Sequence, residues 1–250
     1  MVTGPVLPDA TAYPLAGRVA VITGASSGIG MAAAEKLAAA RVKLVLHGRR
    51  AARLAATAQK FPDVVWLEGD LVDGDAASRL LEMALKHFGT VNYAINNAGI
   101  NHTGTIDQID LDLLCQMVRI NVEAAYRFTY TFLKHFQQEN SGHLIHTTSV
   151  MGHKVRETAG GYAGTKHAIE ALCEALRIEL ARSGVRVSCI APGLVRTELH
   201  RDLDVHPSVS RNISRPLSAA DVADAIYWVM CQPAHINIPQ LVVLPQDHAI

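Results

Sequence analysis

The chain has no excess charge of either sign, since Lys plus Arg number 23 and Asp plus Glu number 23 among its 250 residues. A balanced charge gives no global field that attracts nucleic acid or an anionic membrane, so we expect neither partner. No apolar run reaches the ~20 residues that a membrane-spanning helix needs. The N-terminal residues also lack the basic start and apolar core of a secretory signal. These absences favour a cytoplasmic location.

Metal-binding and disulfide patterns are missing as well. None of the four cysteines forms a Cys-x-x-Cys pair or lies near a histidine at metal-ligand spacing. We therefore expect them to be small, buried apolar residues in a reducing compartment. The twelve histidines form no zinc-type cluster, and His143 and His146, which flank a strand-like Leu-Ile, are expected to be structural. The sequence thus predicts no metal site. The cysteines are Cys115, Cys173, Cys189 and Cys231.

Internal repeats, low-complexity tracts and linkers are also absent, and 250 residues favour one large domain. Apolar residues make up 49% of the chain, enough to fill a core between a sheet and its helices. Strand-like runs lie at 18–22, 43–47, 64–67, 91–95, 143–147, 185–190 and 240–244. Helical patterns lie near 28–40, 76–88, 110–136, 161–182 and 219–231. This alternation predicts an α/β fold with a doubly wound, mostly parallel seven-stranded sheet and helices on both faces.

Two segments fall outside this alternation. Residues 1–14 contain three prolines and predict an irregular arm, either a disordered lead-in or a subunit contact, before a domain at 15–250. Residues 196–217 are polar, with two prolines and four arginines. Because long irregular insertions in compact domains often cover a site, this segment is predicted to be a substrate lid. Ser218, three residues before Asp221, indicates a capping box at the next helix.

A glycine-rich turn follows the first strand. The buried apolar run 18–23 leads into Gly24-Ala-Ser-Ser-Gly28-Ile-Gly30, and a helix follows. Gly24 allows the tight turn, Gly28 lets the backbone approach a pyrophosphate, and Gly30 lets helix and strand pack closely. The phosphates then meet the free N–H groups at the helix N-terminus. The alternative is a flexible surface loop.

Tyr162 and Lys166 stand four residues apart, and Ser149 lies thirteen residues before Tyr162. Positions i and i+4 share one face of a helix, so the ammonium can lie close to the phenol. A nearby cation lowers the pKa of a tyrosine from about 10 and makes it an acid/base near neutral pH. The alternative is a tyrosine and a lysine on a solvated helix.

Together these motifs resemble the short-chain dehydrogenase/reductase family. The matching residues are Thr23-Gly-Ala-Ser-Ser-Gly-Ile-Gly30, Asn96-Asn-Ala-Gly99, Asn121, Ser149, Tyr162, Lys166 and Pro192-Gly193, in the family's order and spacing. The resemblance covers roughly residues 15–245. It implies a Rossmann-type domain that transfers a hydride between a nicotinamide cofactor and a small carbonyl compound or secondary alcohol. It also implies a homodimer or homotetramer.

The resemblance assigns roles to four catalytic residues. Tyr162 would be the general acid/base, and Ser149 would hydrogen-bond the reacting oxygen. Lys166 would lower the pKa of Tyr162 and hold the nicotinamide ribose. Asn121 would hold a water that links Lys166 to solvent, or satisfy backbone groups at a helix bend, and both roles are compatible.

The end of the second strand bears on cofactor choice. An acidic residue there bonds the ribose 2′-OH and selects NAD, but this chain has Gly48 followed by Arg49 and Arg50. An arginine binds a 2′-phosphate through charge-assisted hydrogen bonds, so the sequence favours NADP(H) over NAD(H), with Arg49 as the main contact. Alternatively, the pair is the solvated basic start of the next helix. Ser27 stands where many NADP-using relatives have a basic residue.

The resemblance implies further cofactor contacts near the strand ends. Asp70 would contact the adenine, or cap a helix, and Thr197 would bond the nicotinamide carboxamide. Asn96 is expected to tie neighbouring strands together. The full set of cofactor contacts is Gly24, Ser26, Ser27, Gly28, Ile29, Gly30, Arg49, Arg50, Asp70, Leu71, Asn97, Ala98, Gly99, Tyr162, Lys166, Pro192, Gly193, Val195 and Thr197.

The substrate pocket is predicted from residues that follow the catalytic and cofactor segments. The segment 233–245 resembles the end of NADP-dependent 3-hydroxy acid and serine dehydrogenases, which implies small hydroxy acids or ketones as substrates. Arginines in 196–215 either pair with a carboxylate or form an exposed lid face. A dinucleotide-sensing module and a sugar-nucleotide epimerase or dehydratase are the alternative functions. The pocket residues are His102, Met151, His153, Leu194, Leu199 and His200.

The helix that carries Tyr162 and Lys166 is the family's usual subunit contact. Its apolar residues could face a second copy or the protein's own core. They are Ile169, Leu172, Leu176 and Leu180.

Overall fold

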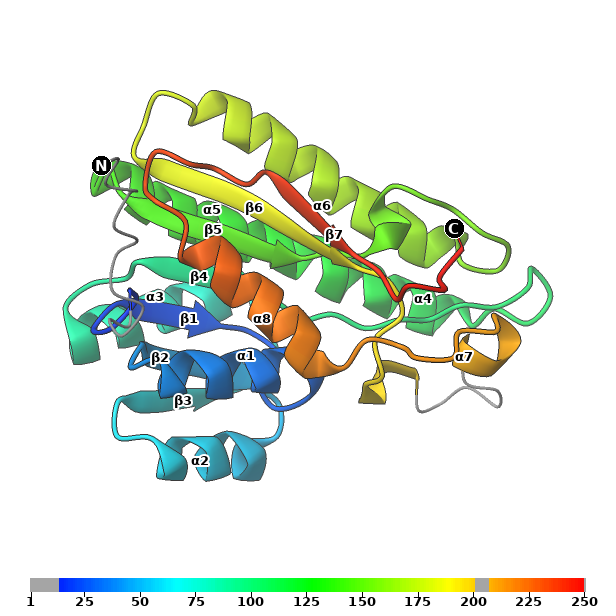
Figure 1. The fold of residues 1–250 in the computed structure, drawn as a ribbon, viewed down its shortest axis with the longest axis horizontal. Coiled ribbons are helices and arrows are strands. Elements are labelled where there is room, and N and C mark those ends of the chain that lie inside the picture. The colour runs from blue at the N-terminus through cyan, green and yellow to red at the C-terminus, as the bar shows by residue number, and fades with distance from the viewer. Residues whose placement is uncertain (1–13, 201–206, 250) are drawn as a thin grey trace, which may run out of the picture.

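One parallel sheet organises the molecule. The computed structural model describes residues 14–200 and 207–249, and its strands lie in the order β3-β2-β1-β4-β5-β6-β7 (Figure 1). Every adjacent pair is parallel, which confirms the predicted fold class and extends "mostly parallel" to all seven strands. The strands are β1 Val19–Ile22, β2 Lys43–Gly48, β3 Val64–Glu68, β4 Tyr93–Asn96, β5 Gly142–Thr147, β6 Val185–Pro192 and β7 Gln240–Val243.

Helices cover both faces of this sheet. The α-helices are α1 Gly28–Ala39, α2 Ala51–Lys60, α3 Ala76–Phe88, α4 Leu111–Val118, α5 Ala125–Gln138, α6 Gly160–Glu179, α7 Pro207–Ser210 and α8 Ala219–Met230. Shorter turns are the π-helix η1 Arg119–Ala124 and the 3₁₀ helices η2 Val150–Gly152 and η3 Glu198–His200. Helix α2 lies outside the sequence-predicted helices, because its exposed face is mostly alanine, arginine and lysine and only Leu54 and Thr57 are buried.

The central strands are buried on both sides, as continuous apolar runs in a parallel sheet predict. All four residues of β1 are buried. Val19 and Val21 pack toward α3, α5 and α6, whereas Ala20 and Ile22 pack toward α1 and α8. Helices α1 and α8 lie in front of the sheet in Figure 1. The alternation along β1 therefore supplies both halves of the core.

Three phenylalanines hold α5 against the sheet. Phe128, Phe132 and Phe136 are each 0% exposed and repeat at i, i+4 spacing. The ring centroids are 4.5 Å apart for the first pair and 6.3 Å for the second. Offset and tilted aromatic pairs at this range add to the apolar burial. The α5 face is thus fixed along its length.

The predicted helix at 110–136 contains a wider π-helical turn. Helix α4 continues without a break into η1 and then into α5. Single π turns inside α-helices are frequent at functional sites. Asn121 lies within this turn and is 3% exposed.

Two predicted local features are confirmed. Ser218 and Asp221 form the capping box of α8, since each side chain accepts a hydrogen bond from the other residue's backbone N–H. Asn96 joins neighbouring strands, because its side chain accepts from the Thr23 hydroxyl at 2.8 Å and lies 3.3 Å from His146 Nδ1.

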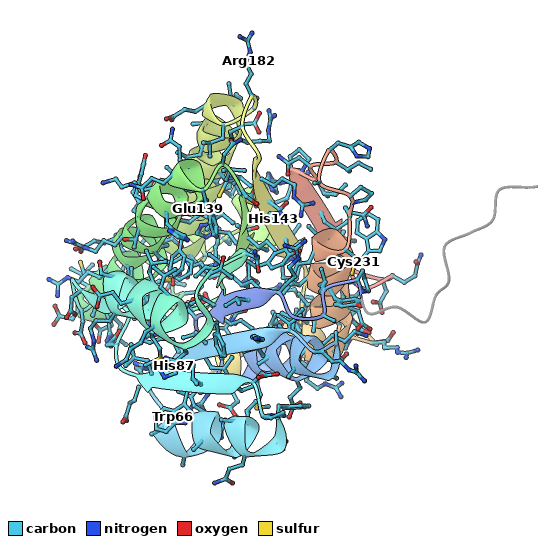
Figure 2. The ribbon with its side chains drawn as sticks, turned by 90° about the vertical axis from the view of Figure 1, so that its left-hand side faces the viewer. Trp66, His87, Glu139, His143, Arg182 and Cys231 are labelled. Carbon is cyan, nitrogen blue, oxygen red and sulfur yellow. The ribbon has the colours of Figure 1, made fainter. Side chains whose placement is uncertain are left out.

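The buried histidines are held by hydroxyl groups. His146 Nε2 lies 2.8 Å from Thr129 Oγ1, and His143 Nε2 lies 2.8 Å from Ser188 Oγ. Figure 2 shows His143 in the interior, whereas Arg182 extends away from the surface. Burial lowers the pKa of His146 to about 3 and that of His143 well below its usual value. Both rings are neutral parts of the core, as the structural interpretation predicts.

The expected burial of all four cysteines requires correction, and of the two alternatives for the apolar residues of α6 the structure favours the protein's own core. Cys115 is exposed and Cys231 is half-buried; only the other two cysteines are buried. The apolar face of α6 is mostly core, because three of its four predicted contact residues are at most 6% exposed and only Leu172 is half-buried. The three are Ile169, Leu176 and Leu180.

The predicted lid is partly helical. It begins after β6 and contains η3 and α7, and an isolated bridge between Val195 and Leu217 joins its two ends. In Figure 1, α7 lies on the side toward which the strand arrows point. Residues 201–206 of the predicted lid and residues 1–13 of the predicted arm lie outside the described residues.

Candidate active site

A cavity of about 350 Å³ opens at the carboxyl ends of the strands. In doubly wound sheets this edge is where ligands bind. Most of the predicted cofactor residues line it: Gly24, Ser26, Ser27, Gly28, Ile29, Arg49, Arg50, Asp70, Leu71, Asn97, Ala98, Gly99, Pro192, Gly193, Val195 and Thr197. Ser149, Tyr162, Lys166, Met151, Leu194 and Leu199 line it as well. Gly30 and Asn121 lie close to these residues but do not line the cavity.

The glycine turn leaves no room for side chains at two positions. Gly24 has φ +67°, and a Cβ there would lie 2.9 Å from Ala98 Cα. A Cβ on Gly30 would lie 2.4 Å from the Gly24 carbonyl oxygen. Helix α1 therefore starts directly against the turn, and its N-cap Ser27 makes no side-chain capping bond. The first N–H groups of α1 remain available to an anion in the cavity.

Thr23 connects this turn to the end of β4. Its hydroxyl oxygen accepts hydrogen bonds from the backbone N–H groups of Asn97 and Ala98, both at 3.1 Å. The Asn97 amide donates back to the carbonyl of Thr23 at 3.3 Å. The two strand ends that border the cavity are thereby held in register.

Lys166 is a buried cation at the inner end of the cavity. Its Nζ donates to the Thr147 carbonyl at 3.2 Å and lies 5.8 Å from the centroid of the Tyr162 ring. Burial lowers the pKa of Lys166 to about 8, and the Glu170 carboxylate opposes that shift. A lysine with this pKa is mostly protonated at neutral pH and titrates just above it.

The pKa of Tyr162 differs from the sequence expectation. Burial raises it above its usual value, and a hydrogen bond with Ser149 and the charge of Arg156 act in the opposite direction. The predicted lowering of the Tyr162 pKa by Lys166 is therefore wrong. The physical reason is that the half-buried phenol loses water, while the ammonium of Lys166 is directed to the Thr147 carbonyl.

Ser149 ends the run of residues that follows β5. It is the N-cap of η2, and its Oγ accepts a hydrogen bond from the Met151 N–H at 3.1 Å. The accepted bond fixes the oxygen and leaves the hydroxyl proton for donation. Ser149 and Tyr162 therefore both contribute a hydroxyl group to the same cavity.

Asn121 links the cavity wall to α6. Its Oδ1 accepts from Ile100 N at 2.9 Å, and its Nδ2 donates to Ile100 O at 2.8 Å and to Thr165 Oγ1 at 3.2 Å. A Cβ on Gly99 would lie 3.2 Å from Asn121 Oδ1 and 3.7 Å from Lys166 Nζ. Asn121 therefore satisfies backbone groups, as one of its predicted roles requires. These bonds hold the loop at Gly99 and Ile100 close to Lys166.

A half-buried carboxylate that the sequence analysis did not identify acts on Lys166. Glu170 is one turn beyond Lys166 on α6, and its side chain is 12% exposed. It accepts a hydrogen bond from Thr148 Oγ1 at 2.5 Å and from Gln240 Nε2 at 3.0 Å. His153 Nε2 lies 3.2 Å from it and also contacts Gln240. The i+4 spacing from Lys166 was the signal available in the sequence.

Two of the predicted substrate-pocket residues, His102 and His153, do not line the cavity. His153 does not line the cavity, because Glu170 and Gln240 hold its ring elsewhere. His102 does not line it either; its backbone N–H contacts the Met117 sulfur at 3.3 Å, and its Nε2 is buried. The side chain of His200 lies outside the described residues.

The end of β2 combines a glycine with an ion-pair cluster. A Cβ on Gly48 would lie 2.9 Å from Ser26 Oγ, so an acidic side chain does not fit there without movement. Arg50 Nη1 donates to Glu198 at 2.5 Å, and Arg53 Nη1 donates to the same carboxylate at 2.6 Å. These arginines lower the pKa of Glu198 to about 2. Glu198 thus joins the lid to the start of α2.

Asp70 and His47 lie at the β2–β3 side of the cavity. Asp70 Oδ1 accepts from Val72 N at 3.2 Å, a turn bond of the kind expected from the capping interpretation. His47 is 2% exposed, and neither ring nitrogen has a hydrogen-bond partner. Burial lowers the pKa of His47 to about 4, although Asp70 opposes this. His47, Arg156, Arg211 and His248 are cavity residues that the sequence interpretation missed.

Neither a cluster of metal ligands nor a membrane-spanning helix is present among the described residues. No group of three His, Cys, Asp or Glu side chains within them could hold a metal ion. None of their helices is both long enough and apolar enough to cross a bilayer.

The strand order and the glycine turn after β1 define a Rossmann-type α/β protein. The family model for short chain dehydrogenases matches residues 18–207. An uncharacterized oxidoreductase of Staphylococcus saprophyticus is 33% identical over 233 residues, which cover 91% of this chain and 97% of the relative. An uncharacterized oxidoreductase of Staphylococcus aureus is 30% identical over 233 residues, which cover 92% of this chain and 98% of the relative. The chain therefore belongs to the short-chain dehydrogenase/reductase family of oxidoreductases.

Solved structures agree with this assignment. An alcohol dehydrogenase from Thermococcus sibiricus, complexed with 5-hydroxy-NADP, has a TM-score of 0.84 and 26% identity, and the match covers 93% of this chain and 98% of that one. A 3-ketoacyl-(acyl-carrier-protein) reductase from Brucella melitensis, complexed with NADH, has a TM-score of 0.85 and 27% identity, with 93% and 99% covered.

Proposed function

We propose that the protein is an NADP(H)-dependent oxidoreductase that interconverts a small carbonyl compound and its secondary alcohol. One observation carries this proposal: Tyr162, Lys166 and Ser149 line the same cavity as the N-terminus of α1. A nucleotide phosphate at that N-terminus would lie in one cavity with an acid/base group and a hydroxyl. Hydride and proton transfer to one substrate require that proximity.

The residues of this cavity fit a dinucleotide. Gly24 and Gly30 have no space for a Cβ, so the backbone of the turn stays open toward the cavity. Asp70 and Leu71 would border the adenine, and Gly99 and Pro192 would border the nicotinamide half. When bound, the nicotinamide supplies or accepts the hydride. Lys166 would hold the adjacent ribose through its remaining N–H donors.

Tyr162 is the proposed proton donor during reduction and the proton acceptor during oxidation. Its raised pKa keeps the phenol protonated near neutral pH, which suits donation to a carbonyl oxygen. Ser149 would donate a hydrogen bond to the same oxygen and stabilise the charge that develops there. Lys166 would favour the phenolate once the phenol has lost its proton.

Preference for NADP(H) over NAD(H) is supported by the end of β2. Gly48 leaves no carboxylate to bond a 2′-OH, and Arg49 and Arg50 both line the cavity. A guanidinium binds a phosphate through paired, charge-assisted hydrogen bonds. The Thermococcus relative was solved with an NADP derivative and the Brucella relative with NADH, so the choice rests on this chain's own residues.

The proposed substrates are small hydroxy acids or ketones, and Met151, Leu194 and Leu199 form the apolar part of the pocket. A cytoplasmic location is supported by four free cysteines. A homodimer or homotetramer is supported by exposed apolar side chains on α4, where Leu111 is 66% exposed and Val118, seven positions later on the same face, is 44% exposed.

A carbonyl panel tests the proposal. The protein is mixed with NADPH or NADH and with aldehydes, ketones and oxo acids, and the nicotinamide absorbance is followed. We expect substrate-dependent oxidation that is faster with NADPH. Absence of oxidation across the panel, with cofactor binding intact, would favour a dinucleotide-sensing module instead.

A further inference from the structure

We propose that Arg156 and Arg211 form an anion subsite that binds the carboxylate of a small hydroxy or oxo acid beside Tyr162. This inference rests on the proposed function and narrows its substrate class from carbonyl compounds in general to carboxylic acids. Neither arginine belongs to the motifs that define the family match.

Arg156 is placed to meet a substrate next to the phenol. It lies in the loop between η2 and α6, six residues before Tyr162, and both residues line the cavity. Its charge acts on Tyr162, which lowers the pKa of the phenol. Among the described residues, no carboxylate forms an ion pair with Arg156. A cation that faces a cavity in this way is complementary to an anionic ligand.

Arg156 is an exposed residue that lines the cavity, so its guanidinium is accessible to a ligand there. Partial desolvation lowers the pKa of Arg156, and among the described residues the charge of Tyr162 acts in the opposite direction. Desolvation of a guanidinium without an anionic partner is unfavourable. A bound carboxylate would supply the partner, in the paired geometry that guanidinium groups favour.

Arg211 reaches the cavity from the lid. It follows α7, its backbone N–H donates to the Pro207 carbonyl at 3.2 Å, and it lines the same cavity as Arg156. The loop before α6 and the lid thus each contribute one cation.

The acidic residues of the cavity lie toward the other half of the sheet. Asp70 follows β3 at one edge, whereas Tyr162 and Arg156 follow β5. Glu198 is held by Arg50 and Arg53 at the β2 end. His248 also lines the catalytic half, but burial and Arg156 lower its pKa, so it is neutral near pH 7. The cavity that Tyr162 lines is therefore also lined by two cations, Arg156 and Arg211.

The test compares acids with their esters. The oxidation of hydroxy acids of three to five carbons and of their methyl esters is measured for three proteins. These are the wild type, Arg156→Gln and Arg156→Lys. We expect Arg156→Gln to lower kcat/KM about 10- to 100-fold for the acids, the range for loss of a hydrogen bond to a charged group. The esters should change less than about 3-fold, and Arg156→Lys should recover part of the loss. Lys154→Gln, an exposed charge change in the same loop, should leave both substrates unaffected.

Three outcomes would overturn the subsite. The first is a wild-type enzyme that prefers the esters. The second is an equal loss of activity on acids and esters in Arg156→Gln, which would mean that Arg156 acts only by lowering the pKa of Tyr162. The third comes from calorimetry of the hydroxy acids with the cofactor-loaded enzyme, where equal affinity for wild type and Arg156→Gln would exclude the subsite even without turnover. If ketones and esters react but Arg156 shows no selectivity for acids, the proposed function stands and only this inference fails.

Discussion

Lys166 Nζ lies 5.8 Å from the centroid of the Tyr162 ring and donates its hydrogen bond to the Thr147 carbonyl instead of the phenol oxygen. The pair therefore shares one wall of the cavity without a direct bond. The electrostatic coupling between Tyr162 and Lys166 therefore depends on how the neighbouring residues shift the pKa of each group. For Lys166, the Glu170 carboxylate has the largest effect that opposes burial.

Replacement of Glu170 by glutamine should shift the pH dependence of catalysis. Loss of the carboxylate removes the interaction that opposes the burial of Lys166, so the pKa of Lys166 should fall below its present value of about 8. We expect the alkaline limb of the kcat/KM profile to move to lower pH. The matched control is Glu174→Gln on the same helix, where the exposed carboxylate pairs with Arg177. Identical profiles for wild type and Glu170→Gln would exclude this role.

Replacement of Glu198 by glutamine should strengthen the preference for NADPH. The change frees Arg50 and Arg53 from their shared carboxylate and removes a negative charge near the proposed 2′-phosphate. Because these pairs are exposed, we expect a modest effect, about 3- to 10-fold in the ratio of kcat/KM for NADPH over NADH. Glu35→Gln breaks an exposed pair with Lys60 and serves as the control. An unchanged or lower ratio would mean that Glu198 does not compete with the phosphate.

Loss of Arg49 should affect the two cofactors unequally. Arg49→Ala removes the proposed main contact of the 2′-phosphate, a group that NADH lacks. We expect the Kd of NADPH to rise at least about 10-fold, as for loss of one charge-assisted hydrogen bond, with little change for NADH. Equal weakening of both cofactors, measured by fluorescence titration, would place the recognition of the phosphate elsewhere.

Mild acid should destabilise the protein through its buried histidines. The pKa of His47 is about 4 in the folded state against 6.5 when unfolded, so the unfolded chain takes up a proton first as pH falls. The contribution of neutral His47 to the free energy of unfolding is fully present above pH 6.5 and is lost as the pH falls toward 4. For His47 alone the loss is about 2 kcal/mol at pH 5. Urea unfolding at pH 7 and pH 5 should show a smaller difference in His47→Gln than in wild type; an equal difference would contradict this assignment.

Substitution of Gly30 by alanine should disrupt the glycine turn. A Cβ there would lie 2.4 Å from the Gly24 carbonyl oxygen, so α1 must move away from the cavity. We expect cofactor affinity to fall by more than about 10-fold, since the phosphates bind the N-terminus of this helix. Gly164→Ala on α6, where a Cβ would meet nothing within 4 Å, is the control and should be neutral or stabilising. Normal cofactor binding by Gly30→Ala would refute the close-packing argument.

The sequence predicted the features that local spacing determines. The i, i+4 pair Tyr162 and Lys166, the turn from Gly24 to Gly30 and the capping box of α8 all depend on residues a few positions apart. The seven strands were predictable because buried parallel strands are continuous apolar runs. Helix α2 was not, since few of its residues are buried.

The remaining site features depend on residues far apart in the chain. The pair between Arg50 and Glu198 spans 148 positions, and the bond between Gln240 and Glu170 spans 70. Such contacts leave no periodic signal. The pKa of Tyr162 was predicted in the wrong direction for the same reason, because the sequence reveals the nearby lysine but not the burial of the phenol.

The most direct test is the hydride-transfer rate of Tyr162→Phe, measured in single turnovers with NADPH and a carbonyl substrate. The account predicts a loss of about 10²- to 10⁴-fold, the range for removal of a general acid/base, with NADPH affinity changed little. Wild-type rates in Tyr162→Phe at the same cofactor occupancy would contradict it.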